Sequence, residues 1–286
     1  MHTENLKKIK ALALDLDGTA LLPDTKMGER TVQALKKVME SGVQVIFCTG
    51  RAIEASERYR QAIGAAGPMV YFNGAEVVDM PAGVVLSSTL LGLDIVDYCI
   101  DMARAMDAHF QIFLPPGIGG SGNRWETLVI EKNRPESDAY RLHTNIVPVV
   151  RNLKEAIAVP GLSGCVKAMF ISEPERHDEI RQKLAGRFGD TVYVARTMPA
   201  FLEIMNSGVS KGEGLKTALK HRSLGAGSVL ALGDEENDLL MFDAAGLSAA
   251  PANARENVRK RADFVFGSNA EEGLAAFLEE KFMGGK

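Results

Sequence analysis

The sequence predicts an α/β fold in which a parallel sheet is interrupted by a second, α+β domain. At both ends of the chain, apolar runs of strand length alternate with amphipathic helical segments. This alternation is typical of parallel strands, because each parallel pair needs a crossover connection. Between these ends, runs of strands with helices among them indicate an insertion. We predict residues 1–83 and 200–286 for the parallel domain and 84–199 for the inserted one.

The first eighty residues predict three strands and two helices. The short apolar run at 11–16 is typical of a strand buried on both faces. A helix is predicted over 31–41, because its apolar residues recur at helical spacing until Gly42. Three elements follow in order: a strand at 43–48, a helix at 52–66 and a parallel strand at 69–72, which ends at the turn-forming pair Asn73-Gly74.

The rest of the chain first departs from this pattern and then resumes it. Between 84 and 205, the sequence predicts helices at 91–106, 153–158 and 178–187 and strands at 109–114, 125–130, 166–171, 191–195 and 201–205. The glycine-rich segment at 117–122 matches a dinucleotide-binding pattern, but a strand follows it, so we interpret it as a flexible hairpin loop. Ser210 and Glu213 form a capping-box pattern that starts the next helix. Strands at 229–232, 247–250 and 264–266 then alternate with helices at 237–244, 254–261 and 273–281.

Composition excludes several classes of protein. The 33 basic and 37 acidic residues give a net charge of −4, without the basic patch of a nucleic-acid-binding protein. No apolar segment reaches the ~18 residues of a membrane span. The three cysteines are far apart and form no disulfide framework, which is typical of a reducing compartment. We therefore expect a cytoplasmic protein, a monomer or weak homodimer, that binds neither nucleic acid nor membrane.

Polar residues gather where the predicted parallel strands end. Ligands of parallel α/β sheets bind beyond the carboxyl ends of the strands. The residues expected there are Asp15, Asp17, Thr49, Gly50, Arg51, Asn73, Asp234, Asn237 and Asp238. A crowd of carboxylates cannot remain charged and unpaired. Oxygen ligands suit a hard cation, and few protein ligands completed by water favour Mg²⁺.

Lys211 and the first acid pair indicate phosphate chemistry. Lys211 lies at a helix N-terminus, where the helix dipole disfavours a cation unless an anion binds in front of it, and phosphate is a common guest there. Asp15 and Asp17 are two residues apart, so in an extended strand both are expected to point into one site. One acid can attack phosphorus and form an aspartyl phosphate, while the other transfers protons. Gly18 would let the backbone turn close to the phosphate.

Four short segments together resemble a known family. DLDGT at 15–19, TGR at 49–51, SKG at 210–212 and GDEEND at 233–238 are similar, in this order, to the motifs of the haloacid dehalogenase-like phosphatases. The chain most resembles the Cof-like sugar-phosphate phosphatases, which implies a Rossmann-like core with an inserted α/β cap of type C2. One departure is SAAPANA at 248–254, where Gly-Asn-Ala is common in the family.

The resemblance implies a role for each site residue. Asp15 would be the nucleophile and Asp17 the general acid/base, whose backbone carbonyl also reaches Mg²⁺. Asp234 would be a further metal ligand, with Asn237 and Asp238 holding the metal and its waters. The residues expected to bind the substrate phosphate are Gly18, Thr49, Gly50, Arg51, Asn73 and Lys211. Two of these have alternatives: Arg51 could instead pair with a helix acid, and Asn73 could serve only to make a turn.

The expected function is therefore Mg²⁺-dependent hydrolysis of a small phosphorylated metabolite, with a sugar phosphate as the first candidate. Similar relatives with this kind of cap include sucrose-phosphate and mannosyl-3-phosphoglycerate phosphatases and a phosphomannomutase, which stay open as alternatives. A phospho-accepting receiver domain also places Asp, Lys and Thr at strand ends, but it lacks the second Asp and the insertion. A catalytically silent binding protein is a further alternative, and the intact acids argue against it.

Overall fold

A computed structural model describes residues 6–118 and 125–284, which form two compact units. The first unit contains the chain up to Arg51, Ser56–Ser87 and the segment from Ser210 onward; the second contains Ala52–Ala55 and Ser88–Val209. Two strands explain the difference from the expected boundaries at 84 and 199. β5 (Val84–Ser88) pairs within the first unit, and β13 (Phe201–Asn206) pairs within the second.

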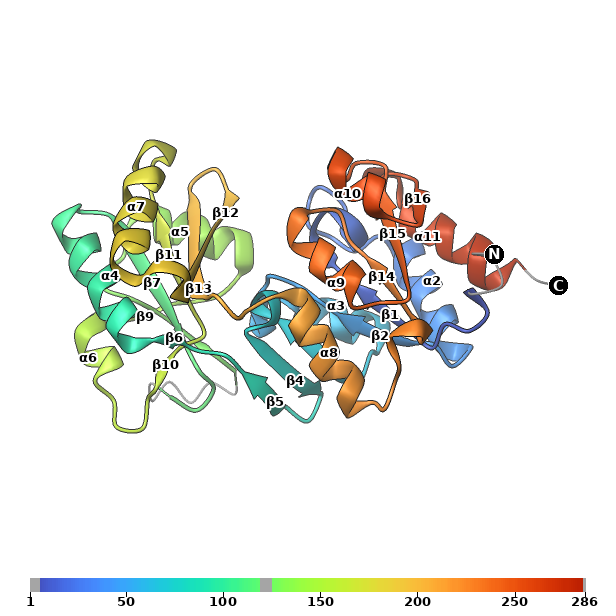
Figure 1. Ribbon diagram of the computed structural model, residues 1–286, viewed down its shortest axis with the longest axis horizontal. Coiled ribbons are helices and arrows are strands. Elements are labelled where there is room, and N and C mark those ends of the chain that lie inside the picture. Colours follow the sequence, from blue (N-terminus) through green and yellow to red (C-terminus); the bar gives the residue numbers. More distant parts are fainter. Residues whose placement is uncertain (1–5, 119–124, 285–286) are drawn as a thin grey trace. The chain divides into compact units, whose positions relative to one another are not determined.

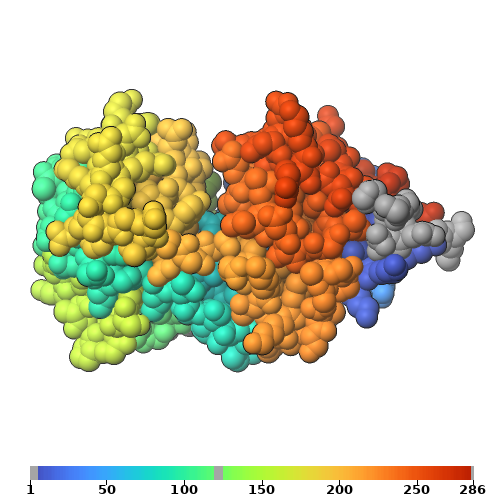
Figure 2. All heavy atoms as spheres, viewed as in Figure 1, coloured from blue at the N-terminus to red at the C-terminus, as the bar shows by residue number. Residues whose placement is uncertain are grey.

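The first unit is built on a five-stranded parallel sheet (Figure 1), as the sequence predicts. The strand order is β16-β15-β14-β1-β2, and every neighbouring pair is parallel. The strands are β1 (Ala11–Leu14), β2 (Gln44–Phe47), β14 (Val229–Leu232), β15 (Leu247–Pro251) and β16 (Phe264–Phe266). The two ends of the chain therefore share one sheet, and in Figure 2 their blue and orange-to-red atoms form one continuous surface.

Helices cover both faces of this sheet, which explains why β1 and β14 are apolar and buried along their whole length. Figure 1 shows α2 (Glu29–Glu40) and α11 (Gly273–Leu278) on one side, and α8 (Lys211–His221) and α9 (Leu239–Asp243) on the other. Ala13 of β1 lies in one buried apolar cluster with Leu215 of α8 and Met241 of α9. Two further helices with described residues in this unit are α3 (Ile53–Ile63) and α10 (Glu256–Arg261).

The strand expected at 69–72 is not a member of the parallel sheet, which corrects the prediction. β3 (Gly67–Tyr71) pairs antiparallel with β4 (Glu76–Met80), and both belong to a separate sheet of order β3-β4-β5. The reason is the turn at Asn73-Gly74, where both residues have positive φ and the chain reverses at once into β4. A parallel bridge between Cys48 and Val70 still joins β3 to the end of β2. The end of β3 therefore remains beside the parallel sheet.

The second unit is α+β and confirms the predicted insertion of mixed strands and helices. Its main sheet has the order β12-β13-β11-β7-β8-β9. Besides β13, this sheet contains β7 (His109–Leu114), β8 (Thr127–Ile130), β9 (Val149–Val150), β11 (Lys167–Ile171) and β12 (Val192–Met198). A separate antiparallel pair is formed by β6 (Leu91–Gly92) and β10 (Gly164–Cys165). The helices are α4 (Leu93–Ala105), α5 (Pro135–Thr144), α6 (Leu153–Ile157) and α7 (His177–Phe188).

Each unit has its own apolar core. In the second unit, one face of the sheet packs against α4, α6 and α7, and Phe170 is fully buried there.

The sequence did not predict α5, although Pro135 at its first position and Asn145 in the left-handed region just after it are ordinary helix boundary signals. Residues 119–124 of the glycine-rich loop lie outside the described residues. No helix in the described ranges has both the length and the apolar character needed to cross a membrane.

Candidate active site

The end of β1 places two acids in different surroundings. β1 stops at Leu14, and the chain turns over Leu16–Ala20, where Gly18 has a φ of +74°. A Cβ atom at Gly18 would lie 2.1 Å from Oδ2 of Asp234, so both the backbone and the space require glycine. The sequence led us to expect Asp15 and Asp17 on one face of an extended strand. In the structure β1 has already ended, and the two residues do not share a strand face. The early end of β1 turns their side chains toward different partners.

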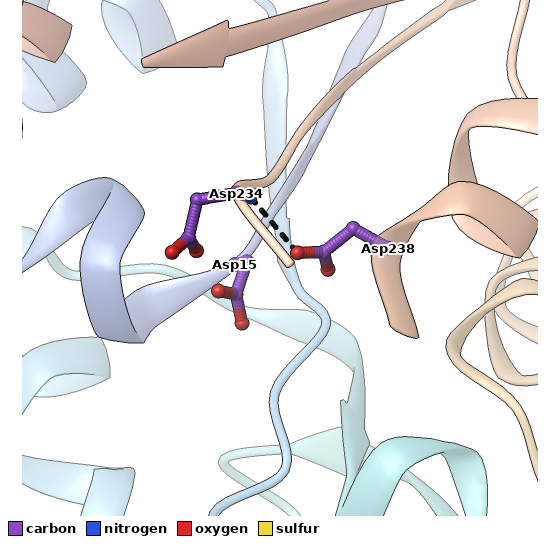
Figure 3. Close-up of side chains that lie close together, drawn as sticks. All are labelled: Asp15, Asp234 and Asp238. Atoms are coloured by element: carbon purple, nitrogen blue, oxygen red, sulfur yellow. Dashed lines mark hydrogen bonds between the residues drawn. The ribbon is translucent and has the colours of Figure 1, made fainter. Parts of the chain in front are cut away.

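Three buried carboxylates converge at the ends of β1 and β14. Oxygens of Asp15, Asp234 and Asp238 all lie within 4.8 Å of one another (Figure 3). Oδ2 of Asp238 accepts hydrogen bonds from the N–H groups of Asp234 (2.9 Å) and Glu235 (3.0 Å), which fixes the loop after β14. The Thr19 hydroxyl donates to Oδ1 of Asp234 at 2.9 Å. The predicted acid cluster therefore contains these three carboxylates but not the Asp17 side chain.

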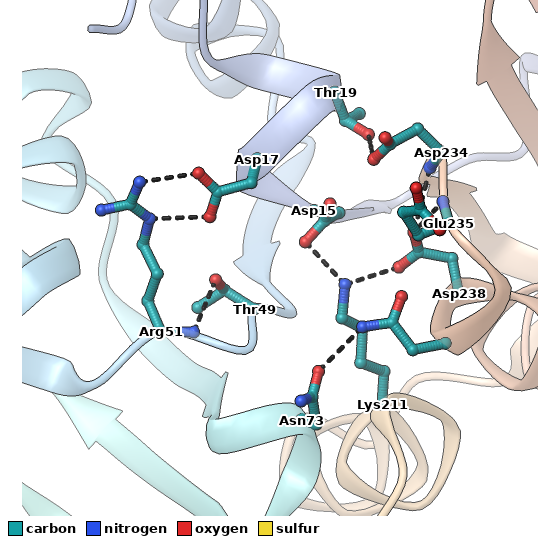
Figure 4. A network of polar contacts seen from close by, with 11 residues as sticks. Asp15, Asp17, Thr19, Thr49, Arg51, Asn73, Lys211, Asp234, Glu235 and Asp238 are labelled. Carbon is teal, nitrogen blue, oxygen red and sulfur yellow. Dashed lines mark hydrogen bonds and ion pairs between the residues drawn. The ribbon is translucent and has the colours of Figure 1, made fainter. Parts of the chain in front are cut away.

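Lys211 supplies the positive charge of the cluster. It is the first residue of α8, directly after Ser210, whose hydroxyl accepts the N–H of Glu213 at 3.1 Å and caps the helix. The Lys211 Nζ donates to Oδ1 of Asp15 at 2.6 Å and to Oδ1 of Asp238 at 2.7 Å (Figure 4). These two carboxylates compensate a buried ammonium that the helix dipole alone would disfavour.

Burial dominates the electrostatics of this cluster. It raises the pKa of Asp15 well above the ordinary value, against the opposing charge of Lys211. Burial, aided by the charge of Asp238, raises the pKa of Asp234 to about 6. Burial by itself would lower the pKa of Lys211, but the charges of Asp15 and Asp238 raise it overall. Three acids around one ammonium leave an excess of negative charge, and an all-oxygen donor set of this kind fits a hard divalent cation.

The ends of β2 and β3 contribute polar groups beside the cluster. The Thr49 hydroxyl accepts the N–H of Arg51 at 3.1 Å, and its own hydrogen is not donated to any group in the described chain. The Asn73 Oδ1 accepts a hydrogen bond from Asn237 Nδ2 at 3.0 Å, so this residue links two strand ends in addition to forming a turn. A Cβ at Gly50 would lie 3.1 Å from the same Asn73 oxygen, so a side chain there would require Asn73 to shift.

Arg51 is paired with Asp17. Its Nε donates to Oδ2 of Asp17 at 2.7 Å, and its Nη2 donates to Oδ1 at 2.6 Å. Figure 4 shows the Asp17 carboxylate directed at Arg51, while the Asp15 carboxylate is directed at Lys211. In the described chain, the carboxylate partner of this guanidinium is therefore Asp17, an acid in the short helical turn after β1.

Sequence comparison assigns the chain to a family. The profile of the family described as haloacid dehalogenase-like hydrolase matches residues 12–278. The chain belongs to this family. It is 29% identical over 276 residues to the 5-amino-6-(5-phospho-D-ribitylamino)uracil phosphatase YitU of Bacillus subtilis, covering 95% of this chain and 97% of that protein. It is 25% identical over 281 residues to the pyridoxal phosphate phosphatase YbhA of Escherichia coli, covering 94% and 97% of the two chains.

The fold of this haloacid dehalogenase-like hydrolase agrees with that of a solved structure. The crystal structure of a Thermotoga maritima protein superimposes with a TM-score of 0.82 at 28% identity, over 95% of this chain and 97% of the other. The four motifs thus identified the family correctly, and the protein is a phosphatase of the haloacid dehalogenase-like type.

One site residue of this phosphatase was missed in the sequence. Asn253 Nδ2 donates to the backbone carbonyl of Gly18 at 2.8 Å, and Asn253 Oδ1 accepts the N–H of Asn269 at 2.9 Å. Asn253 lies in the segment SAAPANA, which differs from the Gly-Asn-Ala sequence common in the family but retains its asparagine. That retained asparagine could have indicated a site residue from the sequence. It stabilises the turn that follows Asp15, so the segment helps to shape the site.

Proposed function

We propose that this protein is a Mg²⁺-dependent phosphatase that hydrolyses the phosphomonoester of a small metabolite through an aspartyl phosphate on Asp15. One observation carries the proposal: the Asp15 carboxylate is held by the buried ammonium of Lys211, next to two acids from another strand end. A carboxylate oriented in this way can attack phosphorus, and the ammonium can hold a phosphoryl oxygen as charge shifts during the attack.

The reaction would proceed in two displacements. An Asp15 oxygen forms a bond to phosphorus while the ester P–O bond breaks, and Asp17 gives its proton to the departing oxygen. Water then attacks the aspartyl phosphate and loses a proton to Asp17, which releases inorganic phosphate and restores the Asp15 carboxylate. The groups proposed to bind the phosphoryl oxygens are Lys211, the Thr49 hydroxyl with its unused hydrogen, the backbone at Gly18 and Gly50, and Asn73.

The proposed metal is Mg²⁺, and the donor set supports it. Asp15 and Asp234 would offer carboxylate oxygens and Asp17 its backbone carbonyl, with Asn237 and Asp238 holding the metal loop and its waters. When bound, the ion would neutralise charge on the phosphoryl group. The hydrogen bonds of Asp238 to two loop N–H groups and to Lys211 support a role for this acid in holding the loop.

A sugar phosphate is the proposed substrate class. The two curated relatives act on phosphorylated small molecules, as their names state: a phosphoribitylamino-uracil and pyridoxal phosphate. A substrate panel should therefore contain hexose and pentose phosphates together with pyridoxal phosphate and flavin precursors. If the protein prefers pyridoxal phosphate to every sugar phosphate, sugar phosphates are not its substrate class.

The test is phosphate release from p-nitrophenyl phosphate. We expect activity with Mg²⁺, none with EDTA, and a loss of about a thousandfold or more in Asp15→Asn, because the nucleophile is removed. Asp243→Asn is the matched control, since this exposed acid pairs with Arg261 away from the cluster. Full activity in Asp15→Asn would overturn the nucleophile. An aspartyl phosphate that persists for minutes without turnover would instead favour a phospho-accepting receiver.

A further inference from the structure

The Arg51–Asp17 pair differs from an ordinary surface ion pair. The Arg51 side chain is 8% exposed, whereas the Asp17 side chain is 53% exposed. Two parallel hydrogen bonds of 2.6 and 2.7 Å use both carboxylate oxygens, a geometry that fixes the plane of the carboxylate as well as its distance. A largely exposed acid is thus held by a buried cation, and the orientation of the acid follows from the position of the cation.

Arg51 is itself held at its backbone and, through one ring contact, at its guanidinium. The Arg51 N–H donates to the Thr49 hydroxyl at 3.1 Å, and the Arg51 carbonyl accepts the N–H of Phe72 at 3.1 Å. The guanidinium carbon lies 5.5 Å from the centroid of the Tyr59 ring, within the range of a cation–π contact. The Tyr59 hydroxyl in turn donates to the Thr25 carbonyl. The backbone of Arg51 is therefore tied to Thr49, and its head group lies against an anchored ring.

The same geometry directs Arg51 away from the phosphoryl site. Its Nε and Nη2 are occupied by Asp17, and Nη1 is buried without a hydrogen-bond partner in the described chain. Figure 4 shows this third nitrogen pointing away from Asp15. No donor of Arg51 is thus offered to a phosphoryl group bound between Asp15 and Lys211. The two acids of the DLDGT segment have separate cations: Lys211 for Asp15 and Arg51 for Asp17.

We propose that Arg51 is the positioning residue of Asp17: it orients this carboxylate for proton transfer and does not bind the substrate phosphate. The proposal rests on the proposed function, because it assumes that Asp17 is the general acid/base. It predicts that Arg51 acts on the reaction solely through Asp17. Loss of Arg51 should then impair proton transfer to the leaving group and leave the binding of phosphate unchanged.

A double-mutant cycle tests this prediction. With an alkyl phosphate as the substrate, we compare Arg51→Ala, Asp17→Asn and the double variant by kcat and KM, and measure inhibition by inorganic phosphate. We expect Arg51→Ala to lower kcat by about 10- to 100-fold, part of the usual contribution of a general acid, with KM and phosphate inhibition changed less than twofold. On the Asp17→Asn background, loss of Arg51 should cost nothing further. Additive losses, or a rise in KM and in the phosphate inhibition constant with kcat retained, would overturn the proposal.

The leaving group provides a second readout. Loss of Arg51 should reduce hydrolysis of an alkyl phosphate at least tenfold more than hydrolysis of p-nitrophenyl phosphate, because p-nitrophenolate leaves with little need for a proton. Equal losses on both substrates would contradict a role in proton transfer. Arg51→Lys keeps the charge but cannot make the bidentate contact. Compared with Arg51→Ala, we therefore expect it to restore less than half of the lost kcat. If Arg51→Ala does not fold, Arg51→Lys undergoes the same cycle and the same criteria apply.

Arg58→Ala is the matched control. Its guanidinium also lies over the Tyr59 ring, 4.7 Å from the centroid, but the side chain is exposed and makes no contact with Asp17. We expect unchanged kinetics in this variant, and a loss equal to that of Arg51→Ala would assign the effect to Tyr59 packing. Asp15→Asn distinguishes failure of the proposed function from failure of the role proposed for Arg51. Activity in that variant would overturn the proposed function, whereas an inactive Asp15→Asn with an additive Arg51 cycle would overturn only the role of Arg51.

Discussion

At the scale of single residues, burial controls the chemistry of the acid cluster. Asp234 has a pKa raised to about 6, first by burial and then by the charge of Asp238. A group of this kind is ionised at neutral pH but takes up a proton in mildly acidic solution. Since a metal ion needs the deprotonated carboxylate, protons and Mg²⁺ should compete for the same oxygens.

This competition predicts a pH-dependent affinity for Mg²⁺. Above pH 6 the Asp234 carboxylate is ionised, so protonation of Asp234 no longer opposes the binding of Mg²⁺. Below pH 6 the affinity should fall by at least about tenfold for each pH unit, because protons compete with the metal at Asp234, and Asp15, whose pKa burial also raises, adds to this competition. Titration calorimetry with Mg²⁺ between pH 5 and 8 measures the effect. Asp234→Asn should bind weakly with no step near pH 6, and a constant affinity of the unaltered protein over this range would contradict the prediction.

At the scale of secondary-structure elements, Glu126, which directly precedes β8, contacts the start of α3. The Glu126 Oε1 accepts the N–H of Glu54 in the first turn of this helix at 3.3 Å, and Oε2 has no partner in the described chain. Burial raises the pKa of Glu126 to about 7. The carboxyl satisfies a free N–H group of the helix, but ionisation in a buried place destabilises the folded protein.

Because Glu126 is buried, we expect it to make the folded protein less stable as the pH rises. The pKa of Glu126 is about 7 when folded, against an ordinary value of 4.5, so the folded state binds more protons between these values. The contribution of Glu126 to the free energy of unfolding should therefore decrease from pH 4.5 to 7, by on the order of 3 kcal/mol. Glu126→Gln keeps the shape without the charge, so we expect it to stabilise the protein at pH 8 and hardly at pH 5.

Urea unfolding of Glu126→Gln at pH 5 and pH 8 measures this difference. Glu29→Gln is the control, because Glu29 is an exposed acid in the first turn of α2. Its effect on the free energy of unfolding should be small at both pH values. An equal change at pH 5 and pH 8 in Glu126→Gln would show that its charge does not affect stability.

At the scale of the whole molecule, the acid cluster and the apolar core of the second unit are separate. The acid cluster, Lys211, Thr49 and the Arg51–Asp17 pair all lie in the first unit. The second unit has its own apolar core, in which the rings of Phe110 and Phe170 lie 4.7 Å apart. Damage to the second core should therefore leave the binding of Mg²⁺ in the first unit intact.

Phe170→Ala tests this independence. Removal of a fully buried ring should cost about 3 to 5 kcal/mol in the stability of the second unit. Scanning calorimetry should show an earlier transition for this unit, while Mg²⁺ still raises the melting temperature of the first. Met198→Ala, which removes an exposed side chain of the same unit, should have little effect. Loss of the Mg²⁺ effect in Phe170→Ala would show that the two units are coupled.

The sequence by itself determined the fold class, most elements and the chemical types gathered at the strand ends. These features follow from local patterns: apolar runs for β1 and β14, helical spacing for α2, and a serine cap for α8. Only the tertiary structure decided how the polar residues pair. Arg51 with Asp17, Asn73 with Asn237 and Asn253 with Gly18 are separated by 34, 164 and 235 positions, respectively. No local periodicity encodes such pairs, because they form only when the packed helices bring separate strand ends together.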